Sequence, residues 1–195
     1  MVRIAVIGQS GEIPQGMRDI AYDVGKEIAL NKALLMTGGT SGVMEYSSKG
    51  AKEAGGLVLG FLAGDSLDSA NDYIDIPITT GLPFDFRSSV LIHSSDAVIV
   101  IGGCNGTLGE LSCAYLNKKP IIVLESSGGL SSKIKDFAYE GCYIDERKNI
   151  KLNFCSDAKT AVDTSIRHYK ERTNKKDSSL KITSYSKKDQ ADLIN

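Results

Sequence analysis

The 195-residue chain lacks several features that mark large classes of protein. It has no tryptophan, two histidines and four cysteines, and the cysteines form neither a C-x-x-C pair nor a zinc-binding spacing. His93 and His168 lie far apart in the sequence and neither has a histidine or cysteine partner at metal-ligand spacing, so no metal site is expected. The cysteines are expected to be free thiols in a reducing compartment, which favours a cytoplasmic protein.

Neither a strong charge of one sign nor a long apolar segment is present. The 23 basic and 24 acidic residues leave a formal net charge of -1, so no basic surface and no nucleic-acid partner are expected. The apolar run at residues 4–7 is too short for the core of a signal peptide. No segment approaches the roughly 20 apolar residues of a membrane-spanning helix, so no membrane partner is expected.

The sequence does contain a regular alternation of strand-like and helix-like segments. Short apolar runs precede longer segments with helical spacing, such as Ile20, Val24 and Ile28. Because parallel strands need crossover helices, we predict a Rossmann-like, doubly wound parallel sheet with helices on both faces, a three-layer αβα fold. The strands are expected at 2–7, 33–36, 57–62, 73–78, 97–101, 120–124 and 150–154, and the helices at 14–30, 43–54, 84–94, 107–117, 131–139 and 157–169.

A single domain is predicted for residues 1–170. From about residue 171 the sequence is polar and lacks strong periodicity, so residues 171–195 are predicted to be a flexible tail or a loosely packed extension. A segment that binds a partner is the alternative interpretation of this tail.

Three glycine-containing turns follow predicted strands, at residues 8–11, 38–42 and 102–106. In open α/β sheets, ligands bind beyond the carboxyl ends of the strands, so the three turns are expected to meet at one crevice. The third turn leads into a helix predicted to start at Thr107. Free N–H groups at a helix start bind anions, and glycine lets a phosphate approach the backbone closely. The turn therefore predicts binding of a nucleotide or a sugar phosphate.

Two motifs resemble those of the Lonely-guy family of cytokinin-activating phosphoribohydrolases, within a wider Rossmann-like superfamily that includes the molybdenum-cofactor carrier proteins. The first, G-G-G-x-x-G-x-M, corresponds to Thr37–Met44. The second is an arginine–lysine pair, an S-D-A strand entry and P-G-G-x-G-T-x-x-E. Arg87, residues 95–97 and residues 103–110 match it without a gap, and the resemblance covers roughly residues 1–125.

The chain departs from the second motif at three positions, where Ser88 replaces lysine, Gly102 replaces proline and Cys104 replaces glycine. These changes look more like the carrier branch, whereas the retained arginine and glutamate favour a hydrolase. The predicted function is that of a nucleoside 5′-monophosphate phosphoribohydrolase, which releases free base and ribose 5-phosphate and requires no cofactor. The alternative is a non-catalytic protein that binds or carries a nucleotide or the molybdenum cofactor.

The resemblance implies an AMP-like ligand or a molybdopterin-type nucleotide, and a homodimer with contacts through the helices at 84–94 and 107–117. The residues expected to contact the ligand are Gly8, Ser10, Gly38, Gly39, Thr40, Gly42, Ser88, Gly103, Cys104, Asn105, Gly106 and Thr107.

The resemblance also implies that Arg87 and Glu110 are catalytic. Cleavage of an N-glycosidic bond develops positive charge on the ribose, which the Glu110 carboxylate can stabilise. Arg87 would hold the phosphate or ribose and favour the ionised form of Glu110. A structural interpretation stays open, because Thr107 and Glu110 have the spacing of a helix capping box. Cys104 has two interpretations, a thiol activated at a helix start or a compact replacement for glycine.

Overall fold

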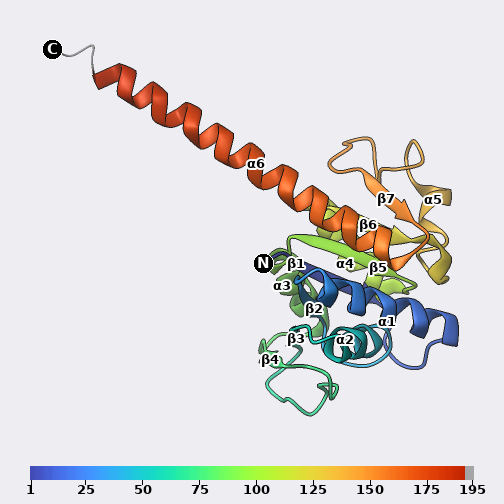
Figure 1. Cartoon of the computed structure of the whole chain (residues 1–195). Coiled ribbons are helices and arrows are strands. Elements are labelled where there is room, and N and C mark those ends of the chain that lie inside the picture. Colours follow the sequence, from blue (N-terminus) through green and yellow to red (C-terminus); the bar gives the residue numbers. More distant parts are fainter. Residues whose placement is uncertain (192–195) are drawn as a thin grey trace.

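The computed structural model describes the backbone of residues 1–191 and the side chains of residues 1–174. Within this part of the chain, seven parallel strands form one sheet in the order β4-β3-β2-β1-β5-β6-β7 (Figure 1). The chain winds from β1 out to β4 and then returns to place β5 on the other side of β1. The strands are β1 (Arg3–Gly8), β2 (Leu34–Thr37), β3 (Val58–Leu62), β4 (Ile76–Thr79), β5 (Ala97–Ile101), β6 (Ile121–Leu124) and β7 (Leu152–Cys155).

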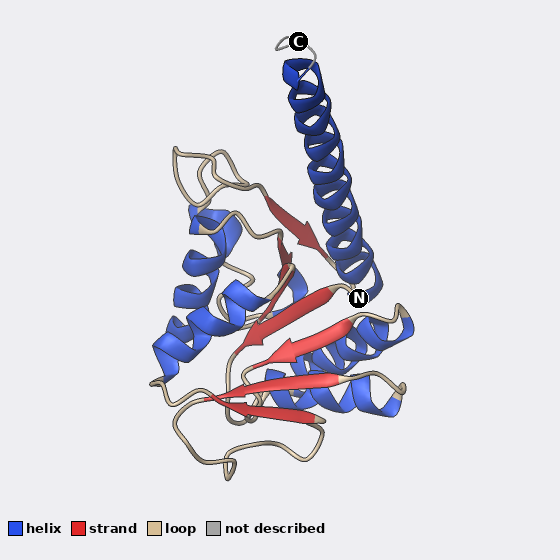
Figure 2. Ribbon diagram, turned by 90° about the vertical axis from the view of Figure 1, so that its left-hand side faces the viewer, coloured by secondary structure: helices blue, strands red, loops and turns tan. Residues whose placement is uncertain are grey.

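Helices cover both faces of the sheet, which confirms the predicted three-layer fold (Figure 2). One face carries α1 (Gln15–Leu30), α2 (Val43–Glu53) and α6 (Ala158–Ala191), and the other carries α3 (Phe84–Ser94), α4 (Asn105–Leu116) and the short α5 (Ile134–Phe137). A 3-10 turn, η1 (Glu125–Ser127), follows β6. None of the described helices is long and apolar enough to cross a lipid bilayer.

The central strands are buried because both faces of the sheet are covered. All of β5 is buried, and its five residues form a continuous apolar run, as expected for a parallel strand between two helix layers. In β1 the side chains alternate between the layers. Ile4 and Val6 pack with α1, α2 and α6, whereas Ala5 and Ile7 pack with α3 and α4. The strand order reverses between β1 and β5, so a crevice is expected where these strands end.

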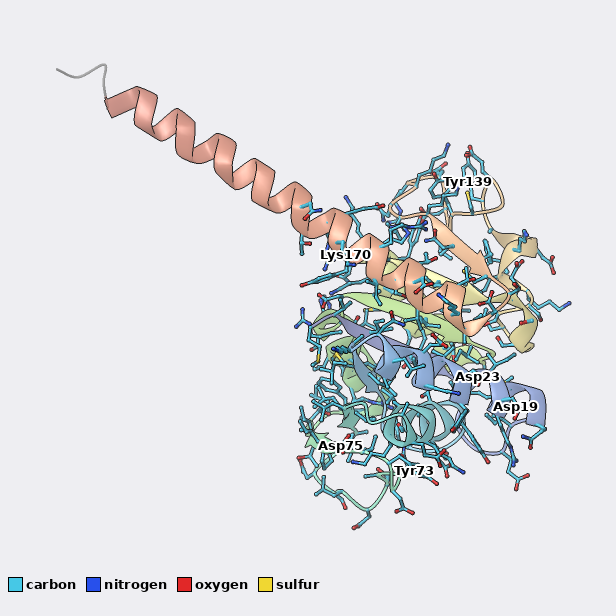
Figure 3. The ribbon with its side chains drawn as sticks, viewed as in Figure 1. Asp19, Asp23, Tyr73, Asp75, Tyr139 and Lys170 are labelled. Carbon is cyan, nitrogen blue, oxygen red and sulfur yellow. The ribbon has the colours of Figure 1, made fainter. Side chains whose placement is uncertain are left out.

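Besides the final helix, two predicted elements differ from the structure beyond their terminal residues. The helix expected at 131–139 is reduced to α5, because Ser131 turns inward to donate to the Gly102 carbonyl (3.0 Å) and Tyr139 pairs with Tyr143. The edge strand expected at 73–78 starts later, at Ile76. Just before it, the carboxylate of Asp75 accepts a hydrogen bond from the Val58 amide (2.9 Å), and Figure 3 labels Asp75 beside β4.

The polar segment after residue 171 continues α6 instead of leaving it (Figure 1). The expectation that the final helix ends at residue 169 is wrong, because lysine, arginine and glutamine are good helix formers even without an apolar stripe. Arg172 of this helix contacts the buried Asp96 at 3.4 Å, so the expected domain boundary at residue 170 falls inside a packed helix. Residues 192–195 of the predicted tail lie outside the described residues.

Candidate functional site

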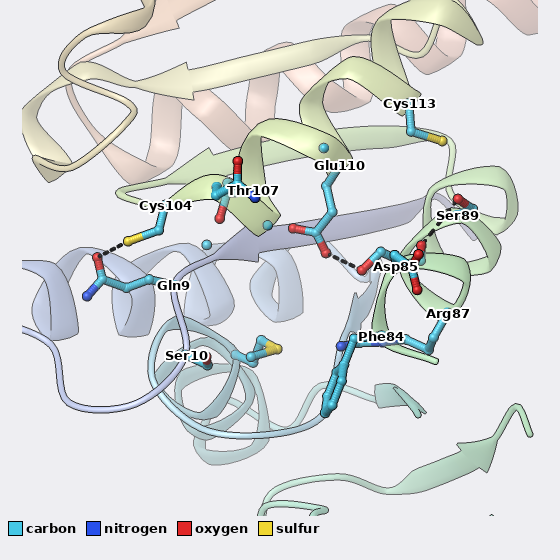
Figure 4. A pocket seen from close by; sticks show the side chains of 16 residues that line it. Gln9, Ser10, Phe84, Asp85, Arg87, Ser89, Cys104, Thr107, Glu110 and Cys113 are labelled. Carbon is cyan, nitrogen blue, oxygen red and sulfur yellow. Dashed lines mark hydrogen bonds between the residues drawn. The ribbon is translucent and has the colours of Figure 1, made fainter. Parts of the chain in front are cut away.

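A cavity of about 640 Å³ lies at the carboxyl ends of β1 and β5, between α3 and α4 (Figure 4). This volume is within the usual range for small-molecule sites, and the position is the crevice expected from the strand order. Most of the sequence-predicted residues line it: Gly8, Ser10, Arg87, Ser88, Cys104, Asn105, Gly106, Thr107 and Glu110. Their contact with a ligand stays a prediction.

The start of α4 forms one wall of this cavity. Gly102 and Gly103 adopt φ values of +56° and +103°, which a residue with a side chain rarely adopts, and α4 then begins at Asn105. Cys104 is the N-cap residue, and its side chain makes no capping hydrogen bond. The first N–H groups of α4 therefore have no side-chain cap beside the cavity, which leaves an anion-binding helix start.

The predicted capping box does not form. Thr107 is the third residue of α4, not its N-cap residue, and it is buried against Gly103. Glu110 lies one turn further along, too far from the helix start to cap it. A purely structural role as a capping residue is therefore excluded for Glu110.

Glu110 is held by a residue from the neighbouring helix. Ser88 Oγ on α3 donates to Glu110 Oε1 at 2.9 Å. Burial raises the pKa of Glu110, and the Ser88 hydrogen bond and the positive charge of Arg87 only partly counteract this rise. The predicted effect of Arg87 on Glu110 is therefore present, but burial outweighs it.

Arg87 is a buried cation with two nitrogens that form no hydrogen bond to any described residue. Its residue is 5% exposed, and its Nε and Nη1 atoms are buried with no hydrogen-bond partner. Its Cζ lies 5.8 Å from the ring centroid of Phe84, which stands beside it in Figure 4. Burial lowers the pKa of Arg87, against the opposing effect of Glu110. Buried charges are ordinarily paired, so this guanidinium favours the approach of an anion.

The glycines of the motif after β2 shape the site from outside the cavity lining. A Cβ atom on Gly38 would lie 1.9 Å from Arg87 Nη1, so the missing side chain makes room for the guanidinium. Gly39 (φ +76°) packs against Leu62, and Gly42 (φ +67°) against the turn after β1. Thr40 donates a weak hydrogen bond to Met44 Sδ at 3.5 Å. We therefore assign these residues a shaping role, and their predicted ligand contact remains untested.

Seven lining residues were not predicted from the sequence. Helical spacing points to one of them, since Cys113 follows Glu110 by three residues on α4. Phe84 similarly precedes Arg87 by three residues on α3. The Cys104 thiol lies 3.9 Å from Gln9 Oε1, an amide oxygen that cannot act as the base of a catalytic thiol. Among the described residues, no three His, Cys, Asp or Glu side chains gather as a metal site would require. The seven residues are Gln9, Met44, Phe84, Asp85, Ser89, Gly109 and Cys113.

Comparison with known proteins places this chain in a family. Residues 1–160 match the SLOG cluster4 family. An uncharacterised protein of Archaeoglobus fulgidus is 37% identical over 155 residues, which cover 80% of this chain and 95% of the relative. The X-ray structure of TM1055 has 35% identity and a TM-score of 0.79, covering 84% of this chain and 97% of that one.

Two further solved structures are similar over most of their length. The molybdenum cofactor binding protein of Rippkaea orientalis is 33% identical, with a TM-score of 0.71 and coverage of 88% of this chain and 97% of that one. The molybdenum cofactor carrier protein of Chlamydomonas reinhardtii is 30% identical, with a TM-score of 0.72 and coverage of 86% and 97%. Taken with the match over residues 1–160, these similarities show that the chain belongs to the SLOG cluster4 family.

Proposed function

We propose that this protein binds a phosphate-bearing ligand of the nucleotide or molybdopterin type in the cavity between β1, α3 and α4. The observation that carries the proposal is the Arg87 guanidinium, which is buried, unpaired and part of the cavity lining. The uncapped start of α4 adds a second group that attracts anions in the same cavity. An anionic group bound there would compensate a charge that the protein itself leaves unpaired.

A carrier of a molybdopterin-type ligand is the form of this function that we favour. The solved structures of a molybdenum cofactor binding protein and of a carrier protein support it, at 33% and 30% identity. A cavity of about 640 Å³ is large enough for a pterin with its phosphate. Ser88 also supports this form, because it stands at the position of the hydrolases' lysine and donates a hydrogen bond to Glu110.

Hydrolysis of a nucleoside 5′-monophosphate is the second candidate function. It is favoured by one observation, that Arg87 and Glu110 line the same cavity. A half-buried glutamic acid whose pKa is raised by desolvation suits protonation of a leaving base, and its ionised form suits activation of water. Arg87 would bind the phosphate or ribose in this reaction.

Binding measurements on the full chain test the main proposal. We expect purified molybdopterin or a nucleoside monophosphate to bind the wild type in calorimetry, and Arg87→Lys to bind it about tenfold or more weakly because the planar guanidinium is lost. Arg18→Lys is the matched control, since Arg18 also lies over an aromatic ring (5.3 Å from Tyr46) but outside the cavity. Failure of the wild type to bind any of these ligands would refute the proposal.

An activity assay separates the two candidates. Release of free base from a nucleoside monophosphate by the wild type, and its loss in Glu110→Gln, would establish the hydrolase. Binding without base release would establish a non-catalytic carrier.

A further inference from the structure

A carboxyl group and a guanidinium share the cavity without pairing. Glu110 Oε1 accepts its hydrogen bond from Ser88 Oγ at 2.9 Å, while Arg87 Nε and Nη1 have no partner. Arg87 and Glu110 nevertheless line the same cavity. Opposite charges at such a site ordinarily form a charge-assisted hydrogen bond. Something must therefore hold the two groups apart.

The Ser88 hydroxyl is the group in position to do this. It lies next to Arg87 on α3, and its hydrogen bond crosses to α4, so it holds Glu110 Oε1 at the hydroxyl instead of at the guanidinium. Phe84 and the Gly38 turn hold the guanidinium on its own side. We propose that Ser88 is a positioning residue that keeps the Glu110 carboxyl away from Arg87, so that ionisation of Glu110 controls the binding of an anionic group at the guanidinium.

The ionised Glu110 carboxylate and a bound anion compete for Arg87. Ionised Glu110 attracts the same guanidinium that the ligand needs and repels the ligand's negative charge, whereas neutral Glu110 does neither. Because burial raises the pKa of Glu110, this change falls at a higher pH than for an exposed glutamate. Binding of an anion should therefore strengthen as the pH falls, and a rise in pH should release it. This inference rests on the proposed function, since it concerns the same site.

Few other groups in the cavity can produce such a dependence. Asp85 on α3 is the second carboxylate of the lining, and it is exposed. The turn after β1 and helix α2 contribute uncharged side chains to the lining. The charged or titratable lining residues other than Glu110 are Asp85, Arg87, Cys104 and Cys113.

The test uses inorganic sulfate as the probe, because its charge stays constant between pH 5.5 and 8.5. We expect the wild-type chain to bind sulfate about tenfold more tightly at the lower pH. Glu110→Gln should remove this difference, and the matched variant Asp85→Asn should keep it. A pH dependence that survives in Glu110→Gln would overturn the proposal.

The role of Ser88 needs its own variants. Ser88→Ala should bind sulfate as the wild type does at pH 5.5 but about tenfold more weakly at pH 8.5, because ionised Glu110 is then free to pair with Arg87. Ser88→Thr keeps the hydroxyl and should restore the wild-type profile. An equal loss at both pH values would show a merely structural role and would refute the proposal.

A ligand-free measurement separates this inference from the proposed function. If the wild type binds neither sulfate nor a nucleotide, the proposed function fails. The crystal structure of unliganded Ser88→Ala at pH 8.5 then decides the positioning role alone. Glu110 within 4.0 Å of an Arg87 nitrogen supports it, and a Glu110 that stays apart from Arg87 overturns it.

Discussion

Arg87→Met should stabilise the ligand-free protein while removing its affinity for anions. The substitution keeps an unbranched side chain of similar reach but takes away a buried charge and the two buried nitrogens that lack hydrogen-bond partners. In most proteins, truncating a buried arginine destabilises the fold because a partner is left unpaired. Here the guanidinium is itself the unpaired group, so the expected sign is opposite.

The magnitude follows from the contacts that are lost and relieved. Each buried polar group without a partner lowers the free energy of unfolding by about 1–3 kcal/mol, whereas the cation–π contact with Phe84 raises it by about 0.5–1 kcal/mol. The attraction between Arg87 and Glu110, which the substitution also removes, slightly reduces the expected gain in stability. We therefore expect the free energy of unfolding to rise by about 1–4 kcal/mol. For a chain of this size, a gain of about 2 kcal/mol corresponds to an increase of roughly 4–8 °C in Tm.

Urea denaturation and calorimetry of the ligand-free variant measure this gain. Arg18→Met is the control, because Arg18 Nε donates to the Ile13 carbonyl at 2.8 Å and should therefore lose stability when replaced. A destabilisation of Arg87→Met by about 1 kcal/mol or more would refute the reasoning, since it would mean that the guanidinium is satisfied in solution.

Four further predictions concern the site, its pH dependence and the assembly. Gly38→Ala should push the guanidinium aside and cost about 1–3 kcal/mol, whereas Gly16→Ala, with open space around its position, should cost nothing in the same denaturation assay. Burial raises the pKa of Glu110 in the folded state. The stability that Glu110 contributes is therefore full below its unfolded pKa and is lost as the pH rises through its folded pKa. The free energy of unfolding of Glu110→Gln should lack this decline with pH. Burial alone would raise the pKa of Asp96, but the hydrogen bonds and charge of Arg3, together with Arg172, lower it overall. The stability that Asp96 contributes is therefore present above its unfolded pKa and is lost as the pH falls through its folded pKa. Asp96→Asn should remove this acid sensitivity from urea denaturation curves. We also predict a homodimer through α3 and α4, which expose Phe86 (62%) and Leu116 (52%); sedimentation of the wild type as a monomer at micromolar concentration would contradict it.

The sequence by itself determined the fold and the place of the site. The alternation of apolar runs and helical periodicity is a local property of the chain, so it predicts the order of strands and helices. Parallel sheets with crossover helices then follow from general packing rules. The glycine turns after β1 and β5 indicated the crevice because ligands bind where the strand order reverses. Arg87 and Glu110 were predicted from the motifs that contain them, and both line the cavity.

Local patterns also explain the predictions that differ from the structure. Thr107 and Glu110 have the spacing of a capping box, but spacing alone does not say where a helix begins. The positive φ values of Gly102 and Gly103 direct the chain into α4 two residues earlier. The segment after residue 171 lacks an apolar stripe, yet a helix that is anchored at Arg172 can extend beyond the body on propensity.

Only the tertiary structure decided which groups of the site meet. Ser88 and Glu110 lie 22 residues apart on two helices, and Gly38, which follows β2, meets Arg87 of α3. The hydrogen bond on Glu110, the space for the guanidinium and its lack of a partner all depend on how α3 and α4 pack against the sheet. Contacts of this kind depend on distances between elements, which residue types and their spacing along one element do not record.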